Sequence, residues 1–227
     1  MEAILHEETA LYRWLNERGG QAFANRDNDL IMKWIKDLRP PITYGVHPES
    51  DCVGRLVSTF PTLQFRWDFN AKALIDAPLL ESKIYGDYNF PHVLAAAAIG
   101  RYLSVPYDKI SEALTNWEPR NNRSQWMAHR GHGVVLDAYN ANPSSMKFAL
   151  ESFSTLKGEK LYFLGDMLEL GDHSVLEHKE ILSLCQSLNI TDQTYLVGSE
   201  FYNACSSHPF RFESIDSLLA WLDTHPI

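Results

Sequence analysis

Apolar residues near the start of the chain recur every three to four positions, which is the spacing of one face of an α-helix. Two stripes of this kind occur, one of Ala10, Leu11, Trp14 and Leu15 and one of Leu30, Ile31, Trp34 and Ile35. The first helix is expected to end at Gly19-Gly20 and the second at Pro40-Pro41, because glycine and proline both interrupt helices. We expect both stripes to be buried in a hydrophobic core.

Alternation of apolar and polar residues then predicts β-strands. Phe65, Trp67 and Phe69 alternate with polar residues, as in an antiparallel strand that has one face in solvent. The predicted strands of this half are 21–25, 42–44, 54–60, 64–69 and 73–80. Two predicted helices follow, 89–101 and 106–117. The polar, turn-like segment 118–122 predicts a boundary between two domains, 1–120 and 121–227.

In the second half, strands alternate with helices. A hairpin over 125–136, which turns at 130–133, is followed by predicted strands at 161–164 and 194–197. Further helices are expected from Pro143, over 174–188, from Ser199 and after Ser214 as N-cap. This order predicts a parallel, Rossmann-like sheet, and the chain as a whole is expected to be α/β.

Composition and charge exclude several functional classes. The chain has 227 residues and a net charge of −9, which argues against a nucleic-acid partner, since phosphate backbones attract clustered Lys and Arg. No apolar run approaches the roughly 18 residues of a membrane span, and the N-terminus lacks the pattern of a secretory signal. The spacing of Cys52, Cys185 and Cys205 fits free thiols in a reducing compartment. We therefore expect a cytoplasmic protein that does not insert into membranes.

The run from Gly133 to Met146 is rich in candidate chemistry. Residues 134–136 are apolar and predict a buried strand, and the pair Asn142-Pro143 predicts the start of a helix. The polar residues between them lie at the carboxyl end of a strand, where open α/β sheets bind ligands. A capped loop with solvated side chains would have the same sequence pattern. The pairs His129/His132 and His173/His178 lack two further well-spaced ligands, so we expect no protein metal site.

The segment LDAYNANPSSM at 136–146 resembles the signature of the Mur ligases. Two further blocks occur in the order of that family. GDYN at 86–89 leads into an apolar helix, and LGDMLELG at 164–171 is followed by His178. The three blocks together are similar to the branch of the family that adds D-alanyl-D-alanine. The resemblance implies the rear part of a Mur ligase central ATPase domain, followed by a Rossmann-like C-terminal domain that is expected to lack its last strand.

The resemblance also implies an activity. The parent protein is expected to be an ATP-dependent amide ligase of peptidoglycan synthesis, which joins D-alanyl-D-alanine to UDP-N-acetylmuramoyl-tripeptide through an acyl phosphate. Its cofactors would be ATP and Mg²⁺, and we expect a monomer. The family's phosphate-binding loop, G-x-x-x-x-G-K-[ST], is missing, because Lys157-Gly158-Glu159-Lys160 has the wrong order. In the family, that loop and most of the Mg²⁺ site precede the region matched here. The isolated chain is therefore expected to be an inactive fragment, or else a rearranged or decayed paralogue.

Nucleotide contacts are implied for five residues. Asn89 resembles the amide that reads the adenine edge, and His92 occupies a nearby position that is often Asn in the family. Asp137 resembles the carboxylate that binds the ribose hydroxyls, and Tyr139 is expected beside the nucleotide. Arg123 resembles the arginine that reaches the ATP phosphates from the domain junction, which suits a guanidinium fork. The ordinary alternatives are an N-cap for Asn89, a loop or helix-start carboxylate for Asp137 and a solvated linker charge for Arg123.

Three further residues, Asn140, Asn142 and Ser145, are implied near the acceptor dipeptide. Two departures from the family pattern bear on the site. Asn122 stands where relatives usually have Gly, which affects the shape of the loop before Arg123. The family's metal-supporting lysine would fall close to Glu8, where no matching context is found.

Two other functions remain open. One is a different amide ligase of the superfamily, such as the enzyme that adds the third peptide residue or a folylpolyglutamate synthase. The other is a noncatalytic nucleotide-binding or interaction module, which the absent phosphate loop favours.

Overall fold

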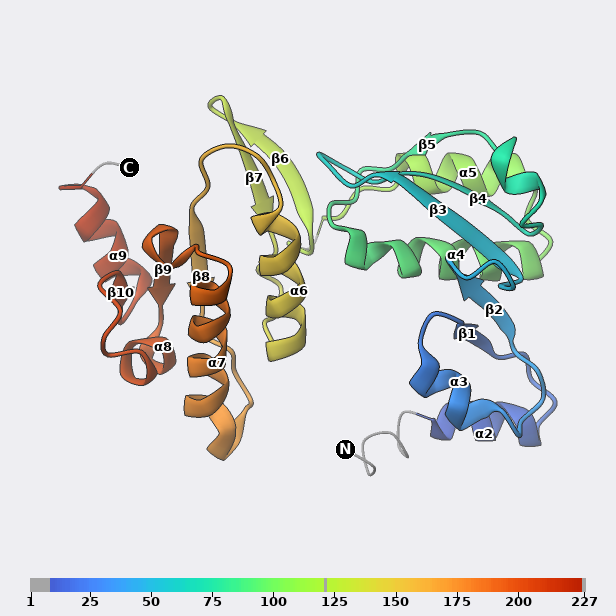
Figure 1. The fold of residues 1–227 in the computed structure, drawn as a ribbon, viewed down its shortest axis with the longest axis horizontal. Helices are drawn as coiled ribbons and strands as arrows, with labels where there is room; N and C mark the ends of the chain where they lie inside the picture. The colour runs from blue at the N-terminus through green and yellow to red at the C-terminus, as the bar shows by residue number, and fades with distance from the viewer. Residues whose placement is uncertain (1–8, 121, 226–227) are drawn as a thin grey trace. The chain divides into compact units, whose positions relative to one another are not determined.

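A computed structural model describes residues 9–120 and 122–225, so the position near Glu8 lies outside the described residues. Figure 1 shows an α/β chain, and the predicted fold class is confirmed. The described residues form two compact units: unit 1 comprises 9–119 together with 124–135, and unit 2 comprises 120, 122–123 and 136–225. The domain limits 1–120 and 121–227 stay a prediction. In the described residues, no helix has the length and apolar character needed to cross a membrane.

Unit 1 is built on a five-stranded sheet in the order β1-β2-β3-β4-β5. Its first three strands are parallel and the last two pairings are antiparallel. The strands are β1 (Phe23–Asn25), β2 (Ile42–Gly45), β3 (Cys52–Ser58), β4 (Gln64–Asp68) and β5 (Leu80–Glu81). The helices are α2 (Ala10–Glu17), α3 (Asp29–Ile35), η1 (Ala73–Ile75), η2 (Asp87–Asn89), α4 (Phe90–Tyr102) and α5 (Tyr107–Asn116).

Helix α4 packs closely on this sheet. A methyl group placed on Gly54 of β3 would lie 2.5 Å from a Leu94 methyl carbon and 2.6 Å from the Phe90 ring. Ala97 and Ala98 on the same helix are fully buried, and their short side chains favour close approach of helix and sheet. On β4, Trp67 is buried and stacks on Tyr107 of α5 with ring centroids 4.4 Å apart. These contacts form the core of unit 1.

A hairpin, β6 (Gln125–His129) and β7 (His132–Leu136), forms a separate two-stranded sheet. Arg130 and Gly131 both have positive φ, as a two-residue type I′ turn requires. The hairpin is therefore correct, but the prediction of a buried strand over 134–136 is wrong. These residues are half-buried, because β7 pairs with β6 and does not join the parallel sheet.

Unit 2 contains the predicted parallel sheet, with strands in the order β10-β9-β8. The strands are β8 (Tyr162–Gly165), β9 (Thr194–Val197) and β10 (Arg211–Phe212). The helices are α6 (Pro143–Ser154), η3 (Gly171–His173), α7 (Ser174–Ser187), η4 (Thr191–Gln193), α8 (Ser199–Ala204) and α9 (Ile215–Leu222). Leu196, Phe201 and Met167 are almost fully buried in its core.

Two further expectations are wrong. The predicted strand 73–80 is the short helix η1 followed by β5, because Asp76 and Pro78 interrupt the apolar run and proline cannot donate to a strand ladder. The apolar stripes of α2 and α3 are not buried core: Leu11 is 61% exposed, Trp14 50%, and Trp34 38%. Among the described residues of these two helices, only Ile35 on α3 is buried.

Candidate functional site

The loop between β7 and α6 ends in a reciprocal helix cap. The Asn142 side-chain oxygen accepts a hydrogen bond from the Ser145 backbone N–H at 2.8 Å, and the Ser145 hydroxyl accepts one from the Asn142 N–H at 3.2 Å. This capping box fixes the start of α6. Asn140 accepts a bond from the N–H of Ala141 at 2.9 Å. These three polar side chains therefore shape the loop, and their predicted contact with a dipeptide stays a prediction.

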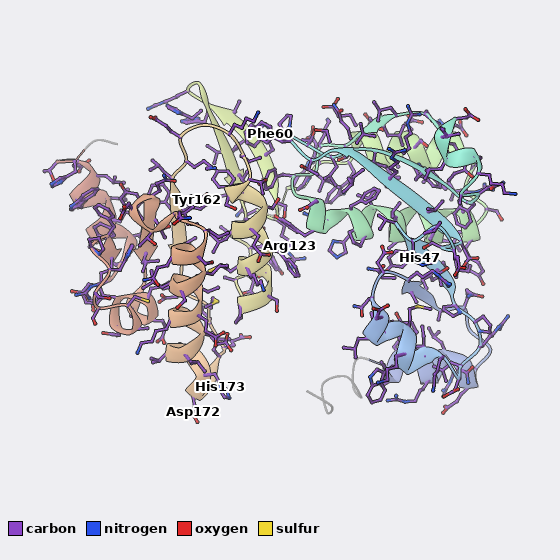
Figure 2. The ribbon with its side chains drawn as sticks, viewed as in Figure 1. His47, Phe60, Arg123, Tyr162, Asp172 and His173 are labelled. Atoms are coloured by element: carbon purple, nitrogen blue, oxygen red, sulfur yellow. The ribbon has the colours of Figure 1, made fainter. Side chains whose placement is uncertain are left out.

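Arg123 and Tyr139 are brought together within unit 2. The guanidinium carbon of Arg123 lies 3.9 Å from the centroid of the Tyr139 ring. Figure 2 labels Arg123 among the side chains. The carbonyl of Asn122 accepts hydrogen bonds from the N–H groups of Ala138 at 2.7 Å and Tyr139 at 3.2 Å. The segment before β6 is thus joined to the loop that carries Asp137, which is exposed.

Asn122 has φ +56°, in the left-handed region. Of the residues other than glycine, asparagine is among those that enter this region most readily. The departure from the family's glycine therefore keeps the backbone conformation that glycine would allow.

Asn89 and His92 lie in unit 1, where η2 joins α4. The Asn89 amide nitrogen donates to the carbonyl of Tyr85 at 2.9 Å, and its oxygen is 3.3 Å from Nδ1 of His92. Asn89 stands at the N-cap position of α4, but its side chain makes no cap hydrogen bond. The N-cap alternative is therefore wrong for the side chain. The structure brings Asn89 and His92 together in unit 1, and Arg123 and Tyr139 together in unit 2.

Sequence reasoning missed the role of Asp166, which directly follows β8. Its two carboxylate oxygens accept the backbone N–H groups of Glu200 and Phe201, each at 2.9 Å, at the start of α8. A Cβ on Gly198 would lie 2.3 Å from this carboxylate, so the chain after β9 approaches it without a side chain. The sequence contained a signal for this contact, since Asp166 directly follows one predicted strand and Gly198 directly follows the next.

His178 completes the same structural cluster. It is fully buried on α7, accepts the N–H of Met167 at Nε2 (3.1 Å), and has Nδ1 2.7 Å from the carbonyl of Ser174. Nε2 therefore holds the loop after β8, while Nδ1 is bound to the first turn of its own helix α7. Glu169 in that loop is exposed and has φ +63°. Asp172 and His173 lie in η3, directly before α7 (Figure 2), and no metal site forms there among the described residues.

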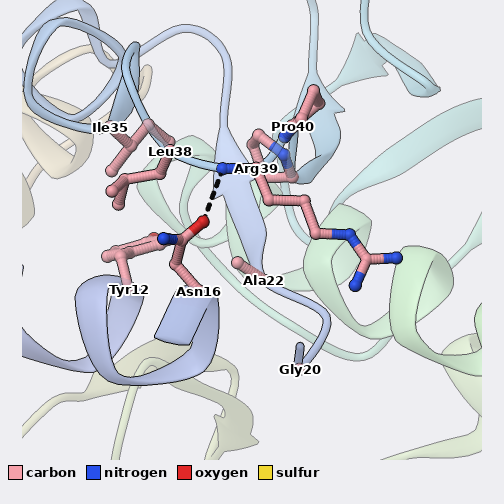
Figure 3. Close-up of a pocket in the computed structure, with 9 residues that line it drawn as sticks. Tyr12, Asn16, Gly20, Ala22, Ile35, Leu38, Arg39 and Pro40 are labelled. Carbon is pink, nitrogen blue, oxygen red and sulfur yellow. Dashed lines mark hydrogen bonds between the residues drawn. The ribbon is translucent and has the colours of Figure 1, made fainter. Parts of the chain in front are cut away.

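Two pockets of unit 1 contain none of the predicted site residues. The first, shown in Figure 3, lies where the Asn16 side chain accepts the Arg39 N–H at 2.8 Å. Its volume of about 10 Å³ holds roughly one water molecule. The second is an open, mainly apolar groove of about 320 Å³, lined by residues that include Val53, Leu56 and Leu74. The first is too small for a nucleotide.

Comparison with known proteins finds a family match over part of the chain. Residues 122–220 match the family described as Mur ligase, glutamate ligase domain. This part of the chain is therefore similar to the Mur ligases. The match includes the capped loop, Arg123, and the Asp166 and His178 cluster, so the predicted family is confirmed.

Mur ligase similarity extends beyond this domain. A UDP-N-acetylmuramoyl-tripeptide–D-alanyl-D-alanine ligase of Buchnera aphidicola is 29% identical over 209 residues, which are 89% of this chain and 44% of the relative. The ligase of the same name from Bacillus subtilis is 36% identical over 100 residues, which are 43% of this chain and 22% of the relative.

The MurF ligase of Thermotoga maritima, solved in complex with ADP, has the same fold. Its TM-score is 0.73 at 18% identity, over 92% of this chain and 47% of that one. The chain thus spans less than half the length of these relatives.

Proposed function

We propose that the chain is part of an ATP-dependent amide ligase of peptidoglycan synthesis, which adds D-alanyl-D-alanine to UDP-N-acetylmuramoyl-tripeptide. The observation that carries this proposal is the similarity over 89% of the chain to a curated ligase of that name. The segment DAYNANP at 137–143 supports this branch over the other amide ligases of the superfamily. The enzyme would be cytoplasmic, since its substrates are soluble nucleotides and peptides, and monomeric.

In each unit taken by itself, the predicted residues have chemistry that suits part of a nucleotide. In unit 1, each polar atom of the Asn89 amide keeps capacity for a further hydrogen bond, which suits the edge of adenine. In unit 2, the exposed Asp137 carboxylate suits a ribose diol, and the Arg123 guanidinium suits phosphate oxygens. In the reaction, the substrate carboxylate would attack the terminal phosphorus of ATP and release ADP, which leaves an acyl phosphate. The amine of D-alanyl-D-alanine would then attack the acyl carbon, releasing phosphate and a proton as the amide forms. Arg123 would offset the negative charge that develops at the phosphorus in the first step.

The described part of this chain holds no ready-made cluster of protein ligands for Mg²⁺. No group of three or more His, Cys, Asp or Glu side chains within 9–120 and 122–225 is placed to hold a metal ion. Mg²⁺ binds oxygen ligands and commonly keeps substrate phosphates among them. We derive no step from Mg²⁺.

A noncatalytic nucleotide-binding module is the second candidate. The observation that favours it is the absence of G-x-x-x-x-G-K-[ST] from all 227 residues. Both candidates require nucleotide binding, but only the ligase requires recognition of the acceptor dipeptide. The dipeptide therefore separates them.

Amide NMR of the ¹⁵N-labelled chain tests both candidates. ATP and ADP are titrated first, with Asp137→Ala as the test variant and Asp172→Ala as an exposed control. D-alanyl-D-alanine is titrated next, with L-alanyl-L-alanine as the stereochemical control. The ligase part predicts saturable shifts at Asn89, His92 and Asp137 with nucleotide, and shifts around Asn140 with the D-dipeptide alone.

Three results would decide against parts of the proposal. Nucleotide shifts without any dipeptide shifts would favour the binding module. An absence of both would remove the nucleotide site from this chain. Amide formation by the purified chain alone, supplied with all substrates, would contradict its role as an inactive fragment.

A further inference from the structure

The backbone on both sides of Arg123 is fixed in an uncommon conformation. Asn122 has φ +56° and Ser124 has φ +46°, and both are left-handed. The Asn122 carbonyl is bound by two N–H groups of the loop at 138–139. Ser124 is buried in unit 1, and its hydroxyl is 2.9 Å from that of Tyr88. Within unit 2, the backbone that leads into Arg123 is therefore held by the two hydrogen bonds to the Asn122 carbonyl.

The Arg123 side chain itself has one contact that orients it. Its guanidinium carbon lies 3.9 Å from the centre of the Tyr139 ring, which is the distance of a cation–π contact. Arg123 makes no hydrogen bond or ion pair with any other residue that the structure describes. One face of the guanidinium thus lies against the Tyr139 ring. The N–H groups along the guanidinium edges keep their full capacity to bind an anion.

A guanidinium held in this way is suited to phosphate. Two parallel N–H groups on one edge match two oxygens of a phosphate group, and the match depends on the orientation of the plane. A free arginine side chain loses rotamer freedom when it binds, and an aromatic surface that holds it beforehand reduces that loss. Tyr139 is 58% exposed, so its ring is available for this purpose and is not required to fill the core.

We propose that Tyr139 is a positioning residue, which holds Arg123 so that the edges of its guanidinium meet the phosphates of a nucleoside triphosphate. The inference rests on the proposed function. It differs from the role expected from the sequence, in which Tyr139 contacts the nucleotide directly. For the positioning role, the essential group of Tyr139 is its aromatic ring, whereas a direct polar contact with the nucleotide would need its hydroxyl.

The test uses the full chain and three variants. Tyr139→Leu removes the ring, Tyr139→Phe removes only the hydroxyl, and Tyr202→Leu is a matched control. Tyr202 carries Arg211 at 4.3 Å in a second cation–π pair of unit 2. Two quantities are measured: the NMR shifts of the Arg123 side-chain protons without nucleotide, and the affinities for ATP and inorganic tripolyphosphate.

The ring current of Tyr139 is expected to move the Arg123 proton signals upfield in the wild type and in Tyr139→Phe, but not in Tyr139→Leu. Tyr139→Leu is expected to weaken binding of both phosphate compounds about two- to fivefold. Tyr139→Phe and Tyr202→Leu should leave both affinities unchanged.

Other outcomes separate this inference from the proposed function. If Arg123→Gln weakens ATP binding but Tyr139→Leu does not, the positioning role is refuted and the nucleotide site stands. Equal losses in Tyr139→Phe and Tyr139→Leu would show a direct contact of the hydroxyl and refute the inference. Absence of ATP binding by the wild-type chain, with the upfield Arg123 signals intact, would refute the nucleotide site and leave only a structural pair.

Discussion

Replacing Asp166 with alanine should destabilise unit 2 without affecting unit 1. The carboxylate accepts two backbone N–H groups at 2.9 Å each, from Glu200 and Phe201, and only 13% of its side chain is exposed. Each hydrogen bond to a charged group contributes about 1.5–3 kcal/mol to stability. In the variant, water would partly replace the lost bonds, because the site is not fully buried. We expect a loss of about 2–4 kcal/mol in the free energy of unfolding of unit 2.

The Asp166→Asn variant should destabilise unit 2 by a smaller amount. Its amide keeps one carbonyl oxygen and can therefore retain one of the two bonds, while its NH₂ group would face an N–H donor of α8. The expected loss is about 1–2 kcal/mol, roughly half that of Asp166→Ala. An order of stability of wild type, then Asn, then Ala is thus expected.

Tryptophan labelling separates the two units in one experiment. Trp221 packs on Phe210 in unit 2, with ring centroids 5.8 Å apart, and Trp67 is buried in unit 1. In the 5-fluorotryptophan-labelled chain, ¹⁹F NMR follows each residue through urea unfolding. The Trp221 transition should shift to lower urea in the Asp166 variants, and the Trp67 transition should not.

Asp172→Ala is the control, because Asp172 lies in the same connection after β8 and is exposed. A shift of the Trp221 transition no larger in Asp166→Ala than in Asp172→Ala would refute the role of the two hydrogen bonds. Equal shifts of the Trp221 and Trp67 transitions would show that the two units unfold together.

Three further predictions concern individual positions. Gly54→Ala should destabilise unit 1 by about 1–3 kcal/mol, because its methyl group would overlap Leu94, and the Trp67 transition should report it. Burial, with the nearby acidic groups, raises the pKa of the Cys52 thiol from 9.0 to about 12. Between these values the unfolded chain releases a proton that the folded chain keeps, so stability should fall as pH rises, by up to about 1.4 kcal/mol per pH unit. Asn122→Ala should destabilise unit 2 by about 1 kcal/mol, because alanine disfavours the left-handed backbone.

Each of these has a matched control. Gly165→Ala adds a methyl group where nothing lies within 4 Å, so it should have little steric effect on its unit. Cys52→Ala should remove the pH dependence due to the thiol, and an unchanged slope would assign it to other groups. Asn122→Gly should stay within about 0.5 kcal/mol of the wild type, since glycine accepts positive φ but gains freedom in the unfolded chain.

Local sequence signals predicted most of the secondary structure of unit 2. Strand β9 coincides with its predicted limits, and the caps at Asn142 and Ser214 start α6 and α9 through reciprocal hydrogen bonds. These features depend on residues within four positions of each other. The prediction of a strand over 73–80 was wrong, because it gave the apolar residues of that segment more weight than Pro78, which interrupts a strand.

Features that depend on distant residues were not predictable. The apolar stripe that contains Trp14 indicates which face of α2 is hydrophobic, but not whether another segment covers it. Likewise, residues 134–136 are apolar, and their burial depends on the partner strand, which the sequence pattern does not identify. The contact between Arg123 and Tyr139 requires the turn at Asn122, which no periodicity reveals.

The strand order of unit 2 has a consequence for its synthesis. In the sheet β10-β9-β8, β9 lies beside β8 and β10 lies beside β9, so each follows its neighbour along the chain. On the ribosome, β9 and β10 therefore each emerge after the strand on which they pack, and the sheet can grow outward from β8 one strand at a time. The Asp166 bonds close only when residues 200 and 201 have emerged, 34 and 35 positions after the carboxylate. We expect them to secure β8 and α8 late in synthesis, once α7 and β9 are in place.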